Sequence, residues 1–589
     1  MMVCPRRATN SGLLVVAWLL FVALAIEPTG LLAVDLRSPS AGTFSPDGKT
    51  LFIANRATAT VSAFDLRAAE LSEIDGRKPS WEYPVGTEPV DIVAFDDQLL
   101  VLDAEQAQLI VLSAGSQYQK QQTISLPDRP VRIVVNPSKR KAFVTCLWSK
   151  QLVRLDQGND GKWKQSAQIS LPFCPREMLL LPNKQLLVAG AFAAKLACLD
   201  LDAFKLLGEH SLQGHGIGSM VATEEAVFLT MQRIDPAAHS SRNDIHWGSL
   251  ISNQMVKIPL SSLADKKLSP VETELGQPGA GAADPSAILH LGQKRFLMTL
   301  SGSAELAIVE PNLGIVERLQ AGVGPSRIAS SDRYVAVLDR FSNSVLVIDR
   351  EALLNDGVLS SDNWGESSAT LRLSAETELT TVQRGEQLFR SGTLSHDSWM
   401  SCHSCHTDGH SSGQQNDNQS DGGFGAPKRI PSLLGVAETA PWAWTGKVAS
   451  LEEQIENSIA STMHGKPLEK EQIADLVAYL NSLKPTKYAT VNSSEERAGG
   501  KIFERENCGK CHSNGIFTSA QTYDVGFSDS QGNTRFNPPS LRGLRLRSSY
   551  LHDGRFQDLR DVFLKAQHQL SAELTERELD QLLQYLNSL

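Results

Sequence analysis

Two short runs near the end of the chain place two cysteines three positions apart and a histidine directly after the second cysteine. They are Cys402-His403-Ser404-Cys405-His406 and Cys508-Gly509-Lys510-Cys511-His512. Two thiols at this spacing can form thioether bonds to porphyrin vinyl groups, and the adjacent imidazole can bind the iron. One such run could also be half of a zinc site. Two runs inside a longer shared pattern favour two covalent c-type haems, with His406 and His512 as proximal iron ligands.

The two haem motifs belong to an internal duplication. Each copy opens with a helical stretch, continues with a Pro-Ser-Leu step after the haem motif, and closes with a helix that ends in Tyr-Leu-Asn-Ser-Leu. The matching positions are Arg384–Phe389 and Arg497–Phe503, Pro431 and Pro539, and Leu451 and Leu559, which begin a further amphipathic helix. This pattern predicts two mainly α-helical cytochrome c domains, over 378–484 and 485–589.

The first half of the chain repeats a different unit of roughly 40 residues, the length of a four-stranded propeller blade. The units begin with an apolar strand near a proline, as at Pro89, Pro130, Pro175, Pro285 and Pro325. A further unit, near Gly218-Ser219-Met220-Val221, carries an insertion around Arg233–Asp244. We therefore predict an all-β, seven-bladed propeller over 34–352, followed by a linker over 353–377. The blade residues themselves suggest no functional site.

Both regions resemble known families. The repeats resemble the YVTN family of β-propellers, whose signature strand is close to Leu51–Asn55. The chain from about Glu378 to Leu589 resembles the bacterial di-haem cytochrome c peroxidases and their MauG-like relatives. Besides the paired haem motifs, this second resemblance is carried by Trp444-Thr445-Gly446, Leu451-Glu452-Glu453-Gln454 and Tyr550-Leu551-His552-Asp553-Gly554-Arg555. It implies an oxidoreductase that moves electrons between two haems and reduces hydrogen peroxide.

The resemblance assigns roles to two residues. Trp444 matches the tryptophan that lies between the two haems in the family, and Gln454 matches an active-site glutamine. Simple packing of Trp442 and Trp444 against the haem edges is the alternative, and packing and bridging are compatible.

The chain also departs from the family. An acidic residue normally follows the glutamine by about three helical turns, where it moves protons during peroxide cleavage, but Met463 and His464 stand there instead. His464 would then have to be the proton donor and acceptor. The loop after the first haem motif lacks a histidine where the family has a displaceable ligand. Arg429 replaces an asparagine associated with calcium, which leaves calcium binding in doubt.

The sixth iron ligands are expected to differ between the copies. Met463 precedes the closing helix of the first copy, where many cytochromes place an axial methionine, and His464 is the competing choice. In the second copy no methionine follows the haem motif, so we select His568, which is nearly in register with Met463. The alternative for His568 is a solvent-facing helix histidine. His552 is expected to make a structural hydrogen bond, as its family counterpart does.

Length, charge and the first residues set the remaining limits. A chain of 589 residues suits several domains, and a formal charge of −10 without a basic block does not favour nucleic acid as a partner. Arg6-Arg7 followed by the apolar run Leu13–Val22 predicts an export signal over 1–33, with an uncleaved membrane anchor as the alternative. We therefore expect a periplasmic or otherwise exported protein.

Outside the haem motifs and the leader, the cysteines are Cys146, Cys174 and Cys198, and three thiols cannot all pair with one another.

Two classes of function follow. One is a di-haem oxidoreductase that takes electrons from a small redox protein, such as a cytochrome or a cupredoxin, and uses them on hydrogen peroxide or on a substrate docked at the propeller. The other is a non-catalytic electron-transfer protein with two six-coordinate haems, whose propeller docks an unknown partner. A structural propeller with relic cytochromes is disfavoured because both haem motifs are intact.

Overall fold

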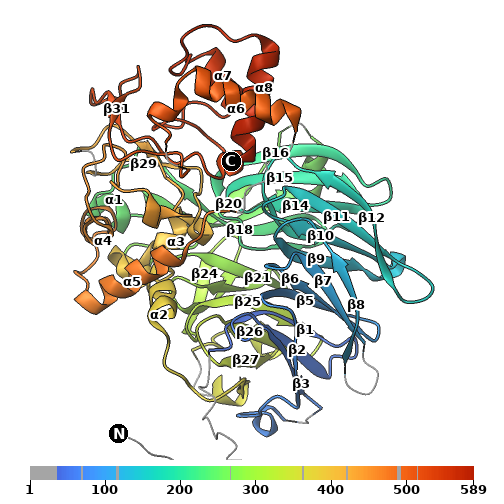
Figure 1. Cartoon of the computed structure of the whole chain (residues 1–589). Coiled ribbons are helices and arrows are strands. Elements are labelled where there is room, and N and C mark those ends of the chain that lie inside the picture. The colour runs from blue at the N-terminus through green and yellow to red at the C-terminus, as the bar shows by residue number, and fades with distance from the viewer. Residues whose placement is uncertain are drawn as a thin grey trace, which may run out of the picture. The chain divides into compact units, whose positions relative to one another are not determined.

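The structure is a computed structural model that describes residues 36–67, 70–113, 118–265, 267–360, 364–419, 422–486, 493–513 and 515–589 (Figure 1). The predicted export signal lies outside these residues. Among the described helices, none is long and apolar enough to cross a membrane.

The N-terminal part consists of antiparallel sheets in which strands pair with their chain neighbours. Within the described residues it contains five separate four-stranded sheets and one eight-stranded sheet, β13–β20. The larger sheet divides into two groups of four strands, β13–β16 and β17–β20, joined by the pairing of His215 with Gln232. The strands are β1–β4 (Pro39–Phe44, Thr50–Asn55, Thr60–Asp65, Trp81–Pro84), β5–β8 (Pro89–Phe95, Gln98–Asp103, Gln108–Ser113, Gln119–Ser125), β9–β12 (Pro130–Asn136, Lys141–Cys146, Gln151–Gln157, Trp163–Ser170), β13–β16 (Pro175–Leu180, Gln185–Gly190, Ala193–Asp200, Lys205–His215), β17–β20 (Met220–Ala222, Ala226–Ile234, Ile251–Pro259, Val271–Glu274), β21–β24 (Pro285–Gly292, Arg295–Leu300, Glu305–Glu310, Gly314–Gln320) and β25–β28 (Pro325–Ser330, Tyr334–Asp339, Ser344–Asp349, Ser368–Arg372).

The first strands of these groups contact one another in sequence. Strand β1 contacts β5, β5 contacts β9, and the series continues through β13, β17 and β21 to β25, which contacts β1 again. The repeat prolines predicted from the sequence begin β5, β9, β13, β21 and β25. A proline fits the first position of a strand because it has no N–H to donate to the ladder. The arrangement is consistent with a β-propeller.

The last sheet extends beyond residue 352. Its fourth strand, β28, pairs with β27 and comes from the segment 353–377, which the sequence suggested as a linker. Ala369 and Leu371 of β28 are buried in the same core as Val345 and Val347 of β27. A strand of five residues with only two buried apolar positions gives too short an alternation to be recognised from sequence.

Both haem-motif copies contain the same close crossing of two helices. A Cβ atom at Gly385 in α2 would lie 2.0 Å from the carbonyl oxygen of Asp475 in α5, and one at Gly499 in α6 would lie 2.0 Å from that of Gln581 in α8. Only glycine permits this approach. Helices α4 and α7 begin at Leu451 and Leu559, as the sequence predicted. The helices are α1 (Arg242–His246), α2 (Thr381–Phe389), α3 (Cys402–Cys405), α4 (Leu451–Asn457), α5 (Lys470–Ser482), α6 (Ser494–Arg505), α7 (Leu559–Leu564) and α8 (Glu576–Ser588), and the short strands are β29 (Gln415–Asn416), β30 (Lys428–Arg429), β31 (Tyr523–Asp524) and β32 (Arg535–Phe536).

The hydrophobic cores of the two copies differ. The core of the first copy includes Ile234, Ile245, Leu250 and Ile251, which belong to the insertion between β18 and β19 and its flanks. The core of the second copy is built from residues 502–589 alone. The remaining thiols Cys146, Cys174 and Cys198 are buried and unpaired.

Candidate haem sites

The first haem motif lines a cavity of about 500 Å³. Its wall includes Cys402, Cys405 and His406, and also Met463 from the segment after α4. Apolar side chains line much of the rest, among them Phe389, Ile430, Leu433, Val448, Ile455, Ile459 and Leu476. Cofactor pockets have volumes in this range and are mainly apolar. The cavity therefore suits a haem attached at this motif.

Both proposed proximal histidines are oriented in the same way. Nδ1 of His406 lies 2.9 Å from the carbonyl oxygen of Pro431, and Nδ1 of His512 lies 3.1 Å from that of Phe517. A carbonyl partner fixes the proton on Nδ1 and leaves Nε2 available to a metal. Burial lowers the pKa of each imidazole to about 4, so both are neutral at pH 7, as iron ligation requires.

The two alternative ligands of the first haem lie in different surroundings. Met463 follows a π-helical turn over Ser458–Thr462, is buried, and lines the cavity. His464 has a φ of +50°, is not among the cavity-lining residues, and places Nε2 2.9 Å from the carbonyl oxygen of Ser240. The structure therefore favours Met463 as the ligand. The proton-transfer role suggested for His464 does not fit this position, because its ring is held outside the cavity.

In the second copy, His568 is the residue that we selected as the sixth ligand. It stands on the turn after α7, and its Nδ1 is buried without a hydrogen-bond partner. Burial is the main cause that lowers the pKa of His512, and the charge of His568 also lowers it. A buried imidazole nitrogen without a hydrogen-bond partner is available to a metal.

The hydrogen bond expected for the His552 side chain is not formed through Nε2, which is buried without a hydrogen-bond partner. The ring stacks on Phe536 instead, with 3.9 Å between the ring centroids. It is the backbone carbonyl of His552 that accepts a hydrogen bond, from the N–H of Arg429.

Trp444 and Gln454 both line the cavity. The indole Nε1 of Trp444 donates to the carbonyl oxygen of Arg429 at 2.8 Å, and the carbonyl oxygen of Trp444 accepts from the N–H of Asn537 at 2.8 Å. Trp444 therefore joins the two copies. Nε2 of Gln454 donates to Ser458 Oγ at 3.1 Å, whereas its Oε1 is buried without a partner and can accept a hydrogen bond from a ligand.

The cavity wall also contains many polar residues, and three of them, His410, Arg429 and Arg547, were not selected from the sequence as site residues. Nδ1 of His410 lies 2.8 Å from Ser432 Oγ, and burial lowers the pKa of His410 to about 3. Burial also lowers the pKa of Arg429 to about 9 and that of Arg547 to about 10, so both remain cationic at neutral pH. No aspartate or glutamate is found among the described residues of the cavity wall. The wall therefore carries positive charge and a neutral imidazole.

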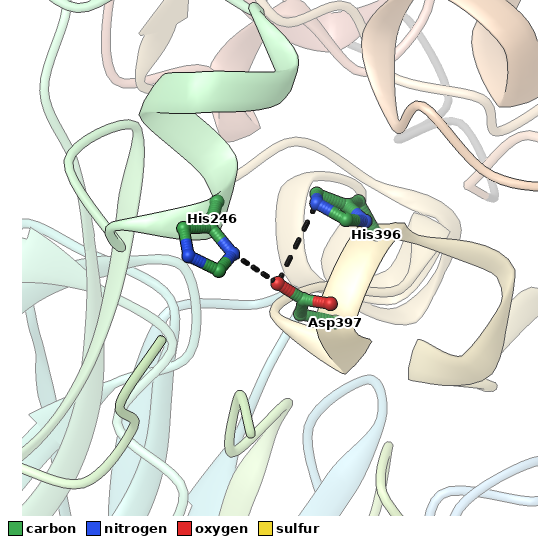
Figure 2. A group of neighbouring side chains, drawn as sticks. All are labelled: His246, His396 and Asp397. Atoms are coloured by element: carbon green, nitrogen blue, oxygen red, sulfur yellow. Dashed lines mark hydrogen bonds and ion pairs between the residues drawn. The ribbon is translucent and has the colours of Figure 1, made fainter. Parts of the chain in front are cut away.

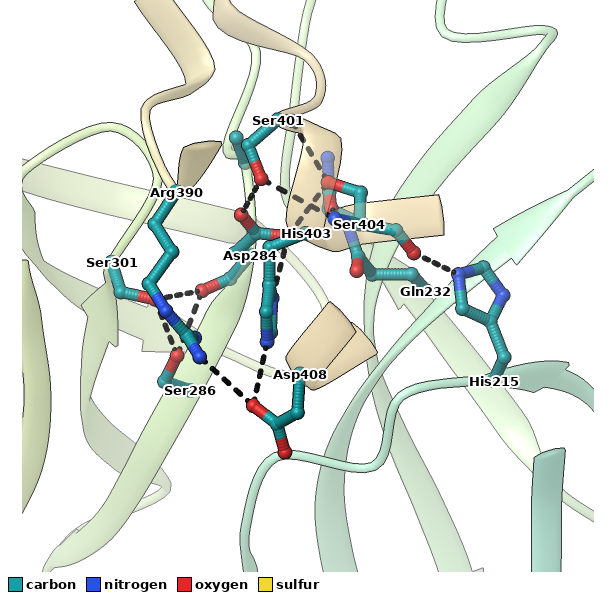
Figure 3. A network of polar contacts seen from close by, with 12 residues as sticks. His215, Gln232, Asp284, Ser286, Ser301, Arg390, Ser401, His403, Ser404 and Asp408 are labelled. Carbon is teal, nitrogen blue, oxygen red and sulfur yellow. Dashed lines mark hydrogen bonds and ion pairs between the residues drawn. The ribbon is translucent and has the colours of Figure 1, made fainter. Parts of the chain in front are cut away.

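The first haem motif is fixed to the β-sheet region by the two residues between its cysteines and by the serine before them (Figure 3). Ser401 and Ser404 donate their hydroxyls to the buried carboxylate of Asp284, at 2.5 and 2.6 Å. Nε2 of His215 lies 2.8 Å from the carbonyl oxygen of Ser404. The ring of His403 lies between Asp284 and Asp408, with Nε2 3.2 Å from Asp408 Oδ1.

Ion pairs extend this junction on both sides. Asp408 accepts from Arg390 at 2.9 Å and also from Arg176 of β13. Glu386 of α2 accepts from Arg340, which follows β26, at 2.6 Å. Burial alone would raise the pKa of Glu386, but Arg340 and two further arginines outweigh it and lower the pKa to about 2.

Charged residues also stand at the third position of four first strands. Arg132 of β9 pairs with Glu177 of β13 at 3.0 Å and with Asp91 of β5 at 3.2 Å. Arg327 of β25 pairs with Glu177 at 3.3 Å. These charges neutralise one another.

Comparison with known proteins agrees with the resemblance predicted for the last third of the chain. Residues 380–492 match the family described as di-haem cytochrome c peroxidase. The methylamine utilization protein MauG of Methylorubrum extorquens is 25% identical over 280 residues, which cover 35% of this chain and 77% of that protein. The segment 380–492 contains the first haem motif, Trp444, Gln454 and Met463.

Solved structures also align with parts of the chain. Hydrazine synthase of Kuenenia stuttgartiensis aligns at 19% identity over 55% of this chain and 98% of that chain, with a TM-score of 0.47. Virginiamycin B lyase of Staphylococcus aureus aligns at 14% identity over 53% of this chain and 95% of that chain, with a TM-score of 0.39. Likenesses this distant assign no activity to the chain.

Proposed function

We propose that this chain is an exported di-haem c-type oxidoreductase in which a seven-bladed β-propeller is fused to two cytochrome c domains. The closed series of contacts from β1 to β25 and back supports seven blades. The matching glycine crossings at Gly385 and Gly499 support two domains of one type, over 378–484 and 485–589. Export is inferred from the leader and from covalent haem attachment, which takes place outside the cytoplasm.

In this proposal each domain attaches one haem. Cys402 and Cys405 attach the first and Cys508 and Cys511 the second, with His406 and His512 as proximal ligands. Met463 and His568 are the sixth ligands. A bound haem supplies one-electron redox chemistry at its iron. Arg429 and Arg547 supply positive charge that the propionate groups would neutralise.

One observation carries the proposal: a single cavity brings the first attachment motif together with Met463, Trp444 and Gln454. Gln454 can hold a peroxide O–H through its unpartnered Oε1. Trp444 hydrogen-bonds across the boundary between the two domains and is the residue that we assign to electron passage. His410 is the other imidazole of the wall, but burial lowers its pKa to about 3, which makes it a poor proton acceptor at neutral pH. A small redox protein, a cytochrome or a cupredoxin, is the proposed electron donor.

A second function, electron transfer without catalysis, is favoured by two specific observations. Met463 is buried in the cavity wall and would close the first iron to peroxide, and the described wall contains no carboxylate. Peroxide reduction would therefore require that Met463 not hold the iron of a bound haem.

The two functions are separated by steady-state oxidation of a reduced cytochrome by hydrogen peroxide. The peroxidase proposal expects turnover at least about a hundredfold above free haem, with a loss of about the same size in Gln454→Ala. His464→Ala should retain activity, because His464 does not reach the cavity. An absence of turnover after pre-reduction, with both haems remaining low-spin, would establish electron transfer instead.

A further inference from the structure

The insertion between β18 and β19 has a feature that the repeat does not explain. It contains α1, which ends at His246, and this histidine lies against the turn that precedes the first haem motif. Nδ1 of His246 lies 2.6 Å from Oδ2 of Asp397, and Nε2 of His396 lies 3.5 Å from the same oxygen. Figure 2 shows the Asp397 carboxylate between the two imidazole rings.

The spacing of these three side chains suits a metal ion. One possible ligand atom from each lies within 4.8 Å of the other two. Atoms bound at about 2.1 Å to one ion are roughly 3.0 to 3.5 Å apart in octahedral or tetrahedral geometry. The separation of His396 from Asp397 already meets this value. A metal ion would replace the proton that now joins His246 to Asp397, and small side-chain rotations would bring both rings to the ion.

The surroundings select the class of metal. Two imidazoles and one carboxylate favour zinc and neighbouring transition metals over magnesium or calcium, which prefer oxygen ligands. The side chains of His246, His396 and Asp397 are 38%, 17% and 19% exposed, so an ion can enter and keep water in its open positions.

The positive charge of the neighbouring Arg242 disfavours a cation at this site. Nε of Arg242 lies 3.3 Å from Nε2 of His396, where it competes for the same nitrogen. Arg242 is exposed and can move into solvent. None of the three ligand residues lines the cavity at the first haem motif, so the site is distinct from the first proposed iron centre.

We propose that His246, His396 and Asp397 bind one divalent transition metal ion, for which Zn²⁺ is the probe, and that this ion clamps the propeller insertion to the segment leading into the first haem motif. The insertion would then serve to join the propeller to the first haem-motif copy, a role that the blade itself does not need. The ion would stabilise this junction because it binds only when the two segments are together.

Calorimetric titration of Zn²⁺ into the full-length holoprotein, stripped beforehand with a chelator, tests the proposal. We expect one ion per chain, with affinity at least about tenfold weaker in His246→Ala and in His396→Ala. His290→Ala, at a histidine outside the cluster, should bind like wild type. Zinc K-edge absorption should show two imidazole ligands, a readout that is separate from the haem iron.

A gain-of-binding variant guards against effects of misfolding. Arg242→Ala removes the competing guanidinium and should bind Zn²⁺ more tightly than wild type. Substoichiometric binding by wild type would overturn the proposal, as would unchanged affinity in both histidine variants.

Discussion

The two haem-motif copies share what the cofactor requires and differ in what surrounds it. Both have a glycine at the helix crossing, and both hold the proximal histidine through Nδ1 and a backbone carbonyl. Between the cysteines, however, the first copy has His403 and Ser404, which contact Asp408 and Asp284. The second copy has glycine and lysine there. We infer that the duplication kept the haem-binding frame and adapted the first motif to the β-sheet region.

The cores show the same division. Ile245 and Leu250 of the insertion belong to the core of the first copy, whereas the second copy encloses a core of its own. The second copy reaches the sheets through Leu546, which packs with Leu147, Cys174 and Phe192. The first copy should therefore depend on the sheet region for stability, and the second copy much less.

The largest expected effect concerns the sixth ligands. Met463→Leu should abolish a weak far-red sulfur-to-iron band of the oxidised protein and lower the potential of one haem, because thioether ligation favours ferrous iron. His568→Leu should leave that band intact and change the other haem. Absorption spectra and a redox titration of both variants provide the check. A band that survives Met463→Leu would show that the first ligand is misassigned.

The next largest effect is expected at the junction. Asp284→Asn removes the charge that accepts hydrogen bonds from Ser401 and Ser404, and should cost about 2 to 3 kcal/mol of stability. The control in the second copy is Tyr523→Phe, which removes the exposed hydrogen bond to the carbonyl of Lys510 and should cost less than about 1 kcal/mol. Thermal unfolding followed by haem absorbance compares the two. Equal losses of stability in the two variants would mean that the Asp284 hydrogen bonds do not anchor the first motif to the β-sheet region.

The paired glycines should give equal and smaller effects. Gly385→Ala and Gly499→Ala each force a Cβ against the backbone of the facing helix, at a cost of about 1 to 3 kcal/mol. Each should loosen the haem of its own copy, seen by the rate of carbon monoxide binding after reduction. An alanine at either position that leaves stability and carbon monoxide binding unchanged would contradict the close helix crossing.

The smallest effect is that of pH. The folded pKa of Glu386 is lowered to about 2, so its contribution to stability is complete above the ordinary carboxyl pKa and is lost as pH falls toward 2. The matching position in the second copy is Gly500, which has no such charge. Thermal midpoints at about pH 7 and about pH 3 should differ more in wild type than in Arg340→Gln, where the pKa of Glu386 is lowered less. The same pH dependence in wild type and in Arg340→Gln would show that the ion pair of Glu386 does not stabilise the junction.

Local signals in the sequence predicted much of the fold. The repeat prolines mark the first residues of strands, and Leu451 and Leu559 begin helices, because these positions depend on backbone chemistry and apolar periodicity nearby. The strand β28 was not recognised because its pairing with β27 is decided by tertiary contact.

The site was less predictable for the same reason. The attachment motifs are local patterns, but the contact of Asp284 with Ser401 joins residues far apart in the chain. Nothing in the run Met463-His464 indicates which side chain faces the cavity. The hydrogen bond between His464 and the carbonyl oxygen of Ser240 depends on the insertion between β18 and β19. Only folding brings that insertion next to His464.

Haem stoichiometry tests the central claim most directly. After acid–acetone extraction, the pyridine haemochrome of the wild-type chain should give two haems per polypeptide. Replacing Cys402 and Cys405 together by alanine, or Cys508 and Cys511 together, should leave one haem in each case. Protein that loses its pigment on extraction, or that holds a single haem before any substitution, would contradict the account.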